Sequence, residues 1–423
     1  MKFITTSRAF QAYQVSRYTA LVFVGIILAK TGFTTSDIGV FETLILASGI
    51  TSFFWLNGML NTYVVKSQQG YENPLNALLK TVAIFTAIIC ILLTILQQPF
   101  LKFFSIQNDF LFYLLPFIIL NNFSFVTEHI LLVNEKRLSL LALAIAHLLL
   151  VPTFVIIASL YFSSIEAVIL GLILFLFLKN VYLIFLILRN KGSHSPWKAF
   201  FQSGIPLSLS YLFGGISVYA DGVIVNNFYS KSDFAVYQYG AREFPLAMLL
   251  ANAFSIVMVK HLSKNLKEGL NEVRSGSTRL WHQLFPLGIL LMVISPWLFP
   301  LIFNEQFEAS YVFFNIYLLL LIPRLVFPQS IIIAKGWTQF QMRISMIEFL
   351  INIVFSLILM SYVGLAGIAL GTVIAYSFEK VALVIFMKRN GIRLKDYTNV
   401  KLLLGYSVIL IIVFLFTTIP GIQ

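Results

Sequence analysis

The feature that most constrains this chain is a series of long apolar stretches. A helical stretch of about 20 apolar residues spans the hydrocarbon core of a bilayer, which is roughly 30 Å thick. Thirteen stretches of this kind follow one another, at residues 9–29, 37–64, 76–97, 110–133, 138–160, 166–188, 203–226, 234–258, 279–302, 309–333, 342–362, 366–387 and 400–419. Because backbone groups in lipid must be hydrogen-bonded internally, long continuous runs predict helices instead of barrel strands. We therefore predict an all-α polytopic membrane protein with 12 or 13 transmembrane helices.

The composition excludes the soluble classes of protein. Only 11% of the 423 residues are charged and 59% are hydrophobic, with a mean hydropathy of +0.89, whereas a soluble domain carries about 25% charged residues. A soluble enzyme is therefore excluded. Despite the net charge of +12, we predict no nucleic-acid partner, because the Lys and Arg residues form no dense patch apart from the apolar stretches. The single cysteine, Cys90, excludes a disulfide framework and a Cys-based metal site.

The distribution of Lys and Arg predicts the orientation in the membrane. With the N-terminus placed in the cytoplasm, 21 of the 29 basic residues fall on the inside, five fall within the stretches, and only Lys30, Lys102 and Lys231 fall outside. An excess of basic residues in cytoplasmic loops is the usual pattern of multi-pass proteins. We therefore predict a cytoplasmic N-terminus.

The sequence also contains signs of an internal duplication. Residues 36–41 (Ser-Asp-Ile-Gly-Val-Phe) recur as residues 232–237 (Ser-Asp-Phe-Ala-Val-Tyr), 196 positions later, and Gly171 with Lys179-Asn180 recurs as Gly371 with Glu379-Lys380, 200 positions later. Chance similarity among apolar sequences is the alternative, but the matches share nearly one offset and one topological position. Six spans per half give a parallel repeat. We predict lobes at 1–198 and 199–398 around a central cavity, and an extra helix within 399–423.

Five basic residues lie within the predicted spans and are candidates for a substrate site: Arg17, Lys179, Arg242, Arg324 and Lys380. A charge facing lipid costs roughly 2.5–3.5 kcal/mol on insertion scales, so these side chains must face the bundle interior. One interpretation is structural ion pairing with acidic residues of other helices. The other is an anion site, because the planar guanidinium of Arg matches phosphate oxygens. Several cations in one cavity would suit a diphosphate better than a neutral drug.

A second set of polar residues suggests a cation site. Glu348 and Asn352 are one helical turn apart in the eleventh span, Asp221 lies in the seventh and Thr372 in the twelfth. Oxygen ligands from three helices could hold Na⁺, or the carboxylates could carry a proton. The alternative is a set of unrelated polar residues satisfied in the core. We predict no other cofactor or metal.

Four short motifs carry a resemblance to a known group of proteins: residues 36–41, 221–226 (Asp-Gly-Val-Ile-Val-Asn), 239–245 (Tyr-Gly-Ala-Arg-Glu-Phe-Pro) and 363–369 (Val-Gly-Leu-Ala-Gly-Ile-Ala). With them the chain resembles the multidrug/oligosaccharidyl-lipid/polysaccharide exporter superfamily, and within it the Wzx-type polysaccharide (O-antigen) flippases. The resemblance implies a MATE-like bundle of two lobes that opens alternately to the two sides of the bacterial cytoplasmic (inner) membrane. It also implies that Arg17 faces a diphosphate, and that Asp221, Glu348 and Asn352 are similar to the cation site of related lipid II flippases.

The implied substrate is an oligosaccharide linked to polyprenyl diphosphate, such as an O-antigen or capsule repeat unit, moved without breaking a covalent bond. Coupling to Na⁺ or a proton is implied, as are a polysaccharide polymerase and glycosyltransferases as partners. Two alternatives remain: a MATE-type multidrug/cation antiporter, and a membrane polysaccharide polymerase or ligase. The short outer loops argue against the enzyme, because they leave little chain from which to build its sites.

Overall fold

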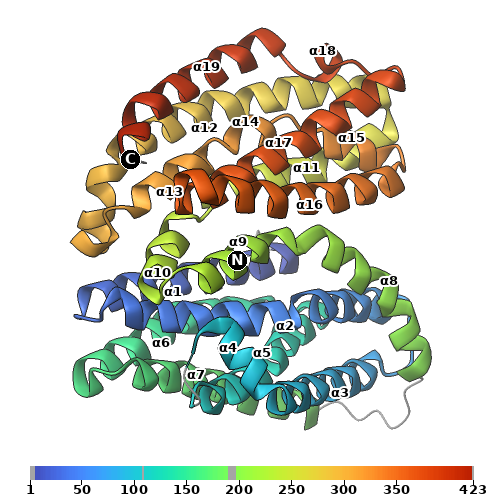
Figure 1. Ribbon diagram of the computed structural model, residues 1–423. Coiled ribbons are helices and arrows are strands. Elements are labelled where there is room, and N and C mark those ends of the chain that lie inside the picture. Colours follow the sequence, from blue (N-terminus) through green and yellow to red (C-terminus); the bar gives the residue numbers. More distant parts are fainter. Residues whose placement is uncertain (1–4, 107–108, 189–196, 422–423) are drawn as a thin grey trace. The chain divides into compact units, whose positions relative to one another are not determined.

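The computed structural model describes residues 5–106, 109–188 and 197–421, and this part of the chain is helical throughout its regular elements (Figure 1). Within these described residues, eleven helices are long and apolar enough to cross a membrane, and the number reaches 13 when each of two bent helix pairs counts as one span. The prediction of an all-α, multi-pass membrane protein is therefore confirmed. Three basic residues of the inside set, Lys2, Arg189 and Lys191, lie outside the described residues.

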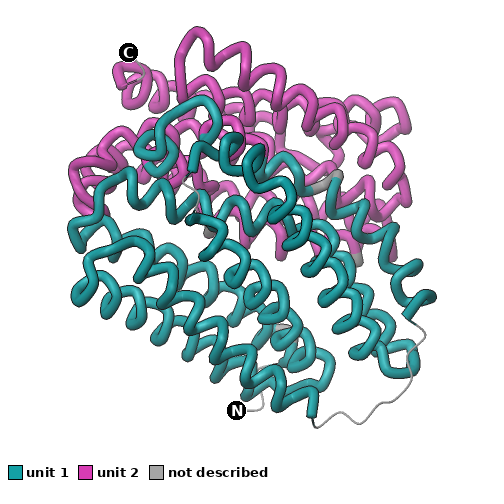
Figure 2. Tube along the Cα trace, turned by 60° about the horizontal axis from the view of Figure 1, so that its bottom comes forward, with its two compact units in different colours: residues 1–219, 226–235 teal, residues 220–225, 236–423 magenta. Residues whose placement is uncertain are grey.

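The chain forms two compact units, which comprise residues 1–219 with 226–235, and 220–225 with 236–423 (Figure 2). These units divide the chain later than the predicted lobe boundary at 198/199, because α8 (Trp197–Gly215) belongs to the first unit. The physical reason is a close helix contact. Gly58 of α2 (Thr35–Gln68) has no side chain, and a Cβ there would lie 2.5 Å from Cα of Ser208 in α8. The lobes themselves, inferred from the repeat, stay a prediction.

The first unit is a bundle of long helices around an aromatic and aliphatic core. Trp55, Leu60, Leu78 and Phe200 are buried at its centre, while large apolar side chains such as Ile95 are exposed, as expected where the surrounding solvent is lipid. Besides α2 and α8, its helices are α1 (Thr6–Lys30), α3 (Pro74–Ile95), α4 (Gln97–Phe104), α5 (Phe110–Val133), α6 (Arg137–Phe162) and α7 (Ile165–Leu188).

In the second unit, glycines bring one pair of helices close together, and stacked aromatic rings join another pair. Gly367 and Gly371 of α17 lie against the backbone of α16, where a Cβ would collide with Leu359 and Ser356, and the Tyr406 ring of α19 stacks on Phe285 of α12. Its elements are α11 (Pro245–Lys264), α12 (Leu266–Ile302), η1 (Glu305–Phe307), α13 (Ser310–Leu318), α14 (Leu321–Arg324), α15 (Pro328–Ala334), α16 (Thr338–Val363), α17 (Leu365–Arg389), α18 (Leu394–Tyr397), α19 (Val400–Thr417) and η2 (Ile419–Gly421).

Three predicted spans are interrupted. The span at 203–226 bends by 58° between α8 and α9 (Ser217–Phe228), and the span at 309–333 bends by 45° before α15. The span predicted at 234–258 consists of α10 (Lys231–Gly240) and α11, with a non-helical break at residues 241–244. Proline explains two of these interruptions. Pro245 and Pro328 each begin a helix, and the residue before a proline is disfavoured in helical conformation. Arg242 and Glu243 are therefore not on a helix, contrary to the prediction.

The two copies of the repeated motif have the same local structure. Thr34 and Asp37 form a capping box at the start of α2, and Ser230 and Asp233 exchange the equivalent hydrogen bonds at the start of α10. Within the first unit the two helix starts touch, because a Cβ on Gly39 would lie only 1.9 Å from the carbonyl oxygen of Lys231. Only glycine permits this approach.

Candidate functional site

A buried cluster in the first unit brings two of the predicted substrate-binding cations to one carboxylate. Arg17 of α1 donates from Nη1 to Oε1 of Glu128 on α5 at 3.1 Å, and Lys179 of α7 donates from Nζ to Oε2 at 3.2 Å. Lys179 also donates to the hydroxyl of Tyr13 at 2.8 Å. Arg17, Lys179 and Glu128 together therefore carry a net charge of +1 when all three are ionised.

Exposure distinguishes the two cations of this cluster. The side chain of Lys179 is 2% exposed and that of Glu128 1%, but that of Arg17 is 31% exposed. The Arg17 guanidinium also lies over the Phe125 ring, 4.4 Å from its centroid, which orients it by a cation–π contact. Arg17 is thus the member of this cluster that a ligand could reach.

In the second unit, two further predicted cations are matched by acidic residues. Arg324, at the end of α14, donates from Nη2 to Oε1 of Glu243 at 2.7 Å, and Lys380 of α17 pairs with its neighbour Glu379. Lys380 and Arg324 also lie near the Tyr376 ring, 4.0 and 5.2 Å from its centroid. Each cation thus has a carboxylate, so the pairing expected under the structural interpretation is present here.

The environment of Glu379 shows how its charge is held in the second unit. Ser345 of α16 donates to Oε1 at 3.0 Å, and the amide of Gln329 on α15 donates to Oε2 at 3.2 Å.

The fifth predicted cation, Arg242, lies in the break between α10 and α11. Its Nε donates to the carbonyl of Gln238 at 3.3 Å, and its guanidinium lies over the Tyr239 ring.

The structure brings three of the four predicted ion-coupling residues together in the second unit. Oδ2 of Asp221, on α9, accepts hydrogen bonds from the hydroxyls of Thr372 and Tyr317, each at 2.5 Å. Thr372 in turn accepts from the amide of Asn352 at 2.8 Å. Glu348 is buried one turn before Asn352 on α16.

Sequence reasoning missed two residues of this group. Tyr317 and Tyr237, which donates to Asp221 at 3.2 Å, are two of 18 tyrosines in the chain, and residue type alone does not distinguish them. The one available signal is that Tyr237 closes the second copy of the repeated motif. Two oxygens in this group, Oδ1 of Asp221 and Oδ1 of Asn352, are buried without a hydrogen-bond partner in the described part of the chain.

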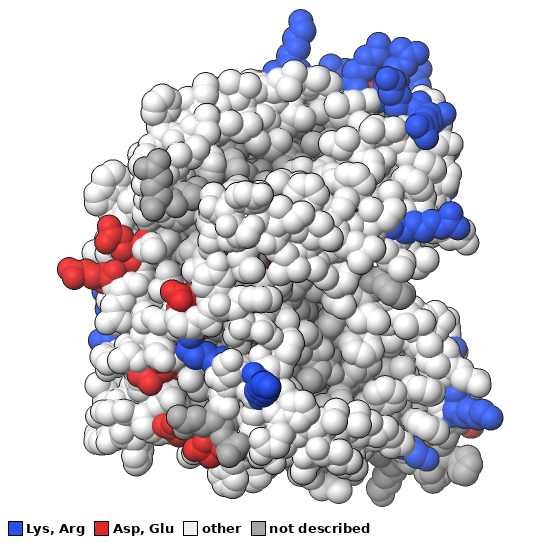
Figure 3. Space-filling view, in the orientation of Figure 1, with Lys and Arg blue, Asp and Glu red and all other residues white. Residues whose placement is uncertain are grey.

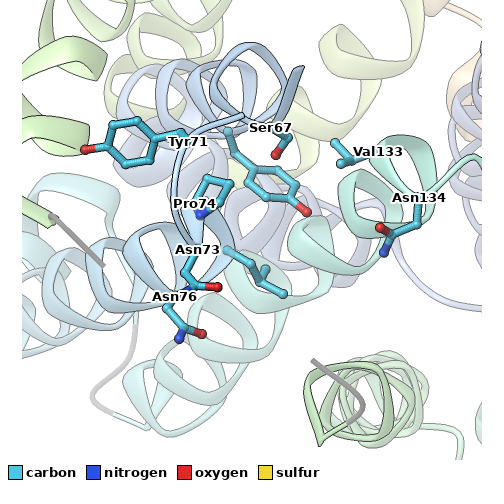
Figure 4. A pocket seen from close by; sticks show the side chains of 9 residues that line it. Ser67, Tyr71, Asn73, Pro74, Asn76, Val133 and Asn134 are labelled. Atoms are coloured by element: carbon cyan, nitrogen blue, oxygen red, sulfur yellow. The ribbon is translucent and has the colours of Figure 1, made fainter. Parts of the chain in front are cut away.

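A separate cavity of about 280 Å³ lies within the first unit (Figure 4). Amide and hydroxyl side chains dominate its walls, and none of the predicted site residues lines it; the lining residues are Tyr63, Ser67, Tyr71, Asn73, Pro74, Leu75, Asn76, Val133 and Asn134. Across residues 5–106, 109–188 and 197–421, no three His, Cys, Asp or Glu side chains gather closely enough to hold a metal ion.

The fold defined by these helices is similar to that of solved membrane transporters. The structure is similar to that of the lipid II flippase MurJ in an inward closed conformation, with a TM-score of 0.74, 17% identity, and coverage of 96% of this chain and 97% of that chain. It is also similar to an inward-facing multidrug resistance MATE family transporter of the MOP superfamily, with a TM-score of 0.60, 13% identity, and coverage of 92% and 95%.

A third similar structure is a MOP superfamily transporter from Pyrococcus furiosus, with a TM-score of 0.55, 12% identity, and coverage of 92% and 96%. Searches of protein-family models and of curated protein sequences find no match. At these identities the similarity concerns the fold. The MATE-like architecture predicted from the sequence is confirmed, and the three similar proteins are transporters or flippases by name, none of them an enzyme.

Proposed function

We propose that this protein is a flippase that moves an oligosaccharide linked to polyprenyl diphosphate, such as an O-antigen or capsule repeat unit, across the bacterial cytoplasmic membrane by alternating access. The observation that carries the proposal is the cluster of Arg17 and Lys179 on the single carboxylate of Glu128. A net positive group inside an apolar bundle is costly unless an anion uses it. The shared fold with a lipid II flippase supports a lipid-linked substrate.

Within this proposal, Arg17 makes the first contact with the diphosphate. Its guanidinium is partly exposed and can donate two parallel hydrogen bonds to phosphate oxygens. Lys179 stays paired with Glu128 and attracts the diphosphate electrostatically without contacting it. Arg242, Arg324 and Lys380 are further candidates for the diphosphate, and Arg324 and Lys380 would first have to separate from Glu243 and Glu379.

Coupling to Na⁺ or a proton would use the group around Asp221. The two buried oxygens without hydrogen-bond partners, on Asp221 and Asn352, are suited to ligate a small cation, or the carboxylate could bind a proton. Partners in this function would be the glycosyltransferases that build the substrate and the polymerase that consumes it.

A second function, a MATE-type multidrug/cation antiporter, is favoured by one observation in the second unit. There, Arg324 and Lys380 are matched by Glu243 and Glu379, and Asp221 adds a further carboxylate. A transport path lined by these carboxylates would select a cation over a diphosphate.

Transport of a fluorescent polyprenyl-diphosphate saccharide in proteoliposomes distinguishes the two functions. Arg17→Gln should slow flipping about 10- to 100-fold, the effect of losing one hydrogen bond to a charged group worth about 1.5–3 kcal/mol. Arg343→Gln, which removes an exposed cation from α16, should leave the rate unchanged. Wild-type flipping by the Arg17 variant would refute the anion role, and export of a cationic dye without lipid flipping would identify the antiporter.

A further inference from the structure

The connection between α17 and α19 is short, ordered and basic, and it lies at the edge of the membrane. Helix α17 ends at Arg389 and α19 begins at Val400, and both are long and apolar enough to cross a bilayer. Because each of these helices occupies the hydrocarbon core, the residues that join them lie at the boundary between lipid and water. We refer to residues 388–401 as the basic platform.

The basic platform is anchored to the second unit, in contrast to a loose charged tail. Ile392, Tyr397 and Thr398 are buried, and helix α18 packs against α12. The carboxylate of Asp396, the only acidic residue of the platform, accepts a hydrogen bond from the backbone N–H of Arg393 at 2.8 Å. The positions of the platform's side chains are thereby limited by folded structure.

Five cations project from this anchored segment, and all are exposed: Lys388, Arg389, Arg393, Lys395 and Lys401. Figure 3 shows Lys and Arg side chains gathered at the end of the second unit where α17, α18 and α19 meet. Five positive charges within 14 residues repel one another at close range. A folded segment that holds them together is therefore suited to a surface of the opposite charge.

Helix electrostatics explains only part of this arrangement. Lys388 and Arg389 occupy the last turn of α17, where the helix dipole favours cations. Lys401 is in the first turn of α19, where the dipole disfavours a cation. Arg393 is at the N-terminal end of α18, where the dipole also disfavours a cation, and Lys395 is in the last turn of this four-residue helix. Helix dipoles thus give no reason for two of the five cations, Arg393 and Lys401.

We propose that the basic platform binds the headgroups of anionic phospholipids in the adjacent leaflet. Clusters of Lys and Arg immediately beside a membrane span are attracted to such headgroups, and the attraction falls within a Debye length, about 10 Å at 0.1 M salt. The phosphates would relieve the repulsion among Arg393, Lys395 and Lys401. The proposal is independent of the transported substrate.

The test measures binding of phosphatidylglycerol to the full-length protein in neutral detergent by native mass spectrometry, with phosphatidylcholine as the reference lipid. One variant combines Arg393→Gln, Lys395→Gln and Lys401→Gln. The charge-matched control combines Lys264→Gln, Lys267→Gln and Arg274→Gln, which remove three exposed cations from the end of α11 and the start of α12. The wild-type protein at high salt serves as a second control.

The platform variant should bind phosphatidylglycerol roughly 100-fold more weakly at low salt, because each of the three removed cations contributes about fivefold to binding an anionic surface. The control variant should change less than about threefold, and salt should weaken wild-type binding. Equal losses in both variants, or no loss in the platform variant, would overturn the proposal. Should the triple variant not fold, Lys395→Gln alone should weaken binding about fivefold, and an unchanged affinity would count equally against it.

Discussion

Replacing Glu128 with Gln tests how the buried cluster of the first unit is held together. The change removes the carboxylate that Arg17 and Lys179 share and leaves the ammonium of Lys179, only 2% exposed, without its counter-ion. Removing one partner of a buried ion pair costs about 3–5 kcal/mol, because the remaining charge stays buried. Arg17 is affected less, since its side chain is 31% exposed and can contact water.

The matched changes separate the charge effect from other causes. Lys179→Met leaves Glu128 paired with Arg17 and should cost about 1.5–3 kcal/mol, the worth of a hydrogen bond to a charged group. The double variant removes the carboxylate and the buried ammonium together. Replacing a buried pair with neutral groups is often close to neutral, so the double variant should recover at least half of the loss caused by Glu128→Gln alone.

The free energy of unfolding of the four proteins, measured by denaturant titration in one detergent, gives the interaction energy between the two positions. Glu305→Gln, which changes an exposed acid outside the cluster, should leave the unfolding free energy within about 0.5 kcal/mol of wild type. If the losses of the two single variants simply add in the double variant, Glu128 does not hold Lys179 in the way that the structure shows.

Three further predictions concern other parts of the chain. Gly39→Ala should lower the unfolding free energy by about 1–3 kcal/mol, because its Cβ would meet the Lys231 carbonyl, whereas Gly405→Ala, which has open space, should be neutral or stabilising in the same titration. Burial lowers the pKa of Lys231 from 10.5 to about 8. The unfolded chain then binds more protons between pH 8 and 10.5, so stability should rise with pH across that window and be constant below it, and Lys231→Met should abolish this rise; a slope that persists in the variant would assign it to other groups. Tyr317→Phe removes a hydroxyl donor to the buried Asp221 and should cost about 1.5–3 kcal/mol, and a change below 0.5 kcal/mol would show that the remaining donors suffice.

The membrane-spanning pattern could be predicted from the sequence because it depends on length and polarity alone. A run such as 138–160 is too apolar for a surface and long enough to cross a bilayer, and α6 is indeed one continuous helix at Arg137–Phe162. The failure at 234–258 has a local cause. Pro245 was present in the sequence, but apolar content hid the break that it imposes at residues 241–244.

The candidate sites were predictable in residue type but not in partnership. The energetic cost of intramembrane charge singled out Arg17, Lys179, Arg324 and Lys380, yet nothing in the sequence distinguished a shared carboxylate from a matched pair. Glu128 is 111 residues from Arg17 and 51 from Lys179, and such long-range contacts leave no periodic signal along the chain.

By itself, the sequence determined that this protein crosses a membrane as helices and that its charged residues must face inward, because lipid cannot solvate backbone or ionic groups. Only the tertiary structure decided which two cations share one carboxylate, which cations have a carboxylate each, and which tyrosines surround Asp221. Those outcomes depend on how neighbouring helices pack and rotate against one another, and close packing is set jointly by residues that lie far apart in the chain.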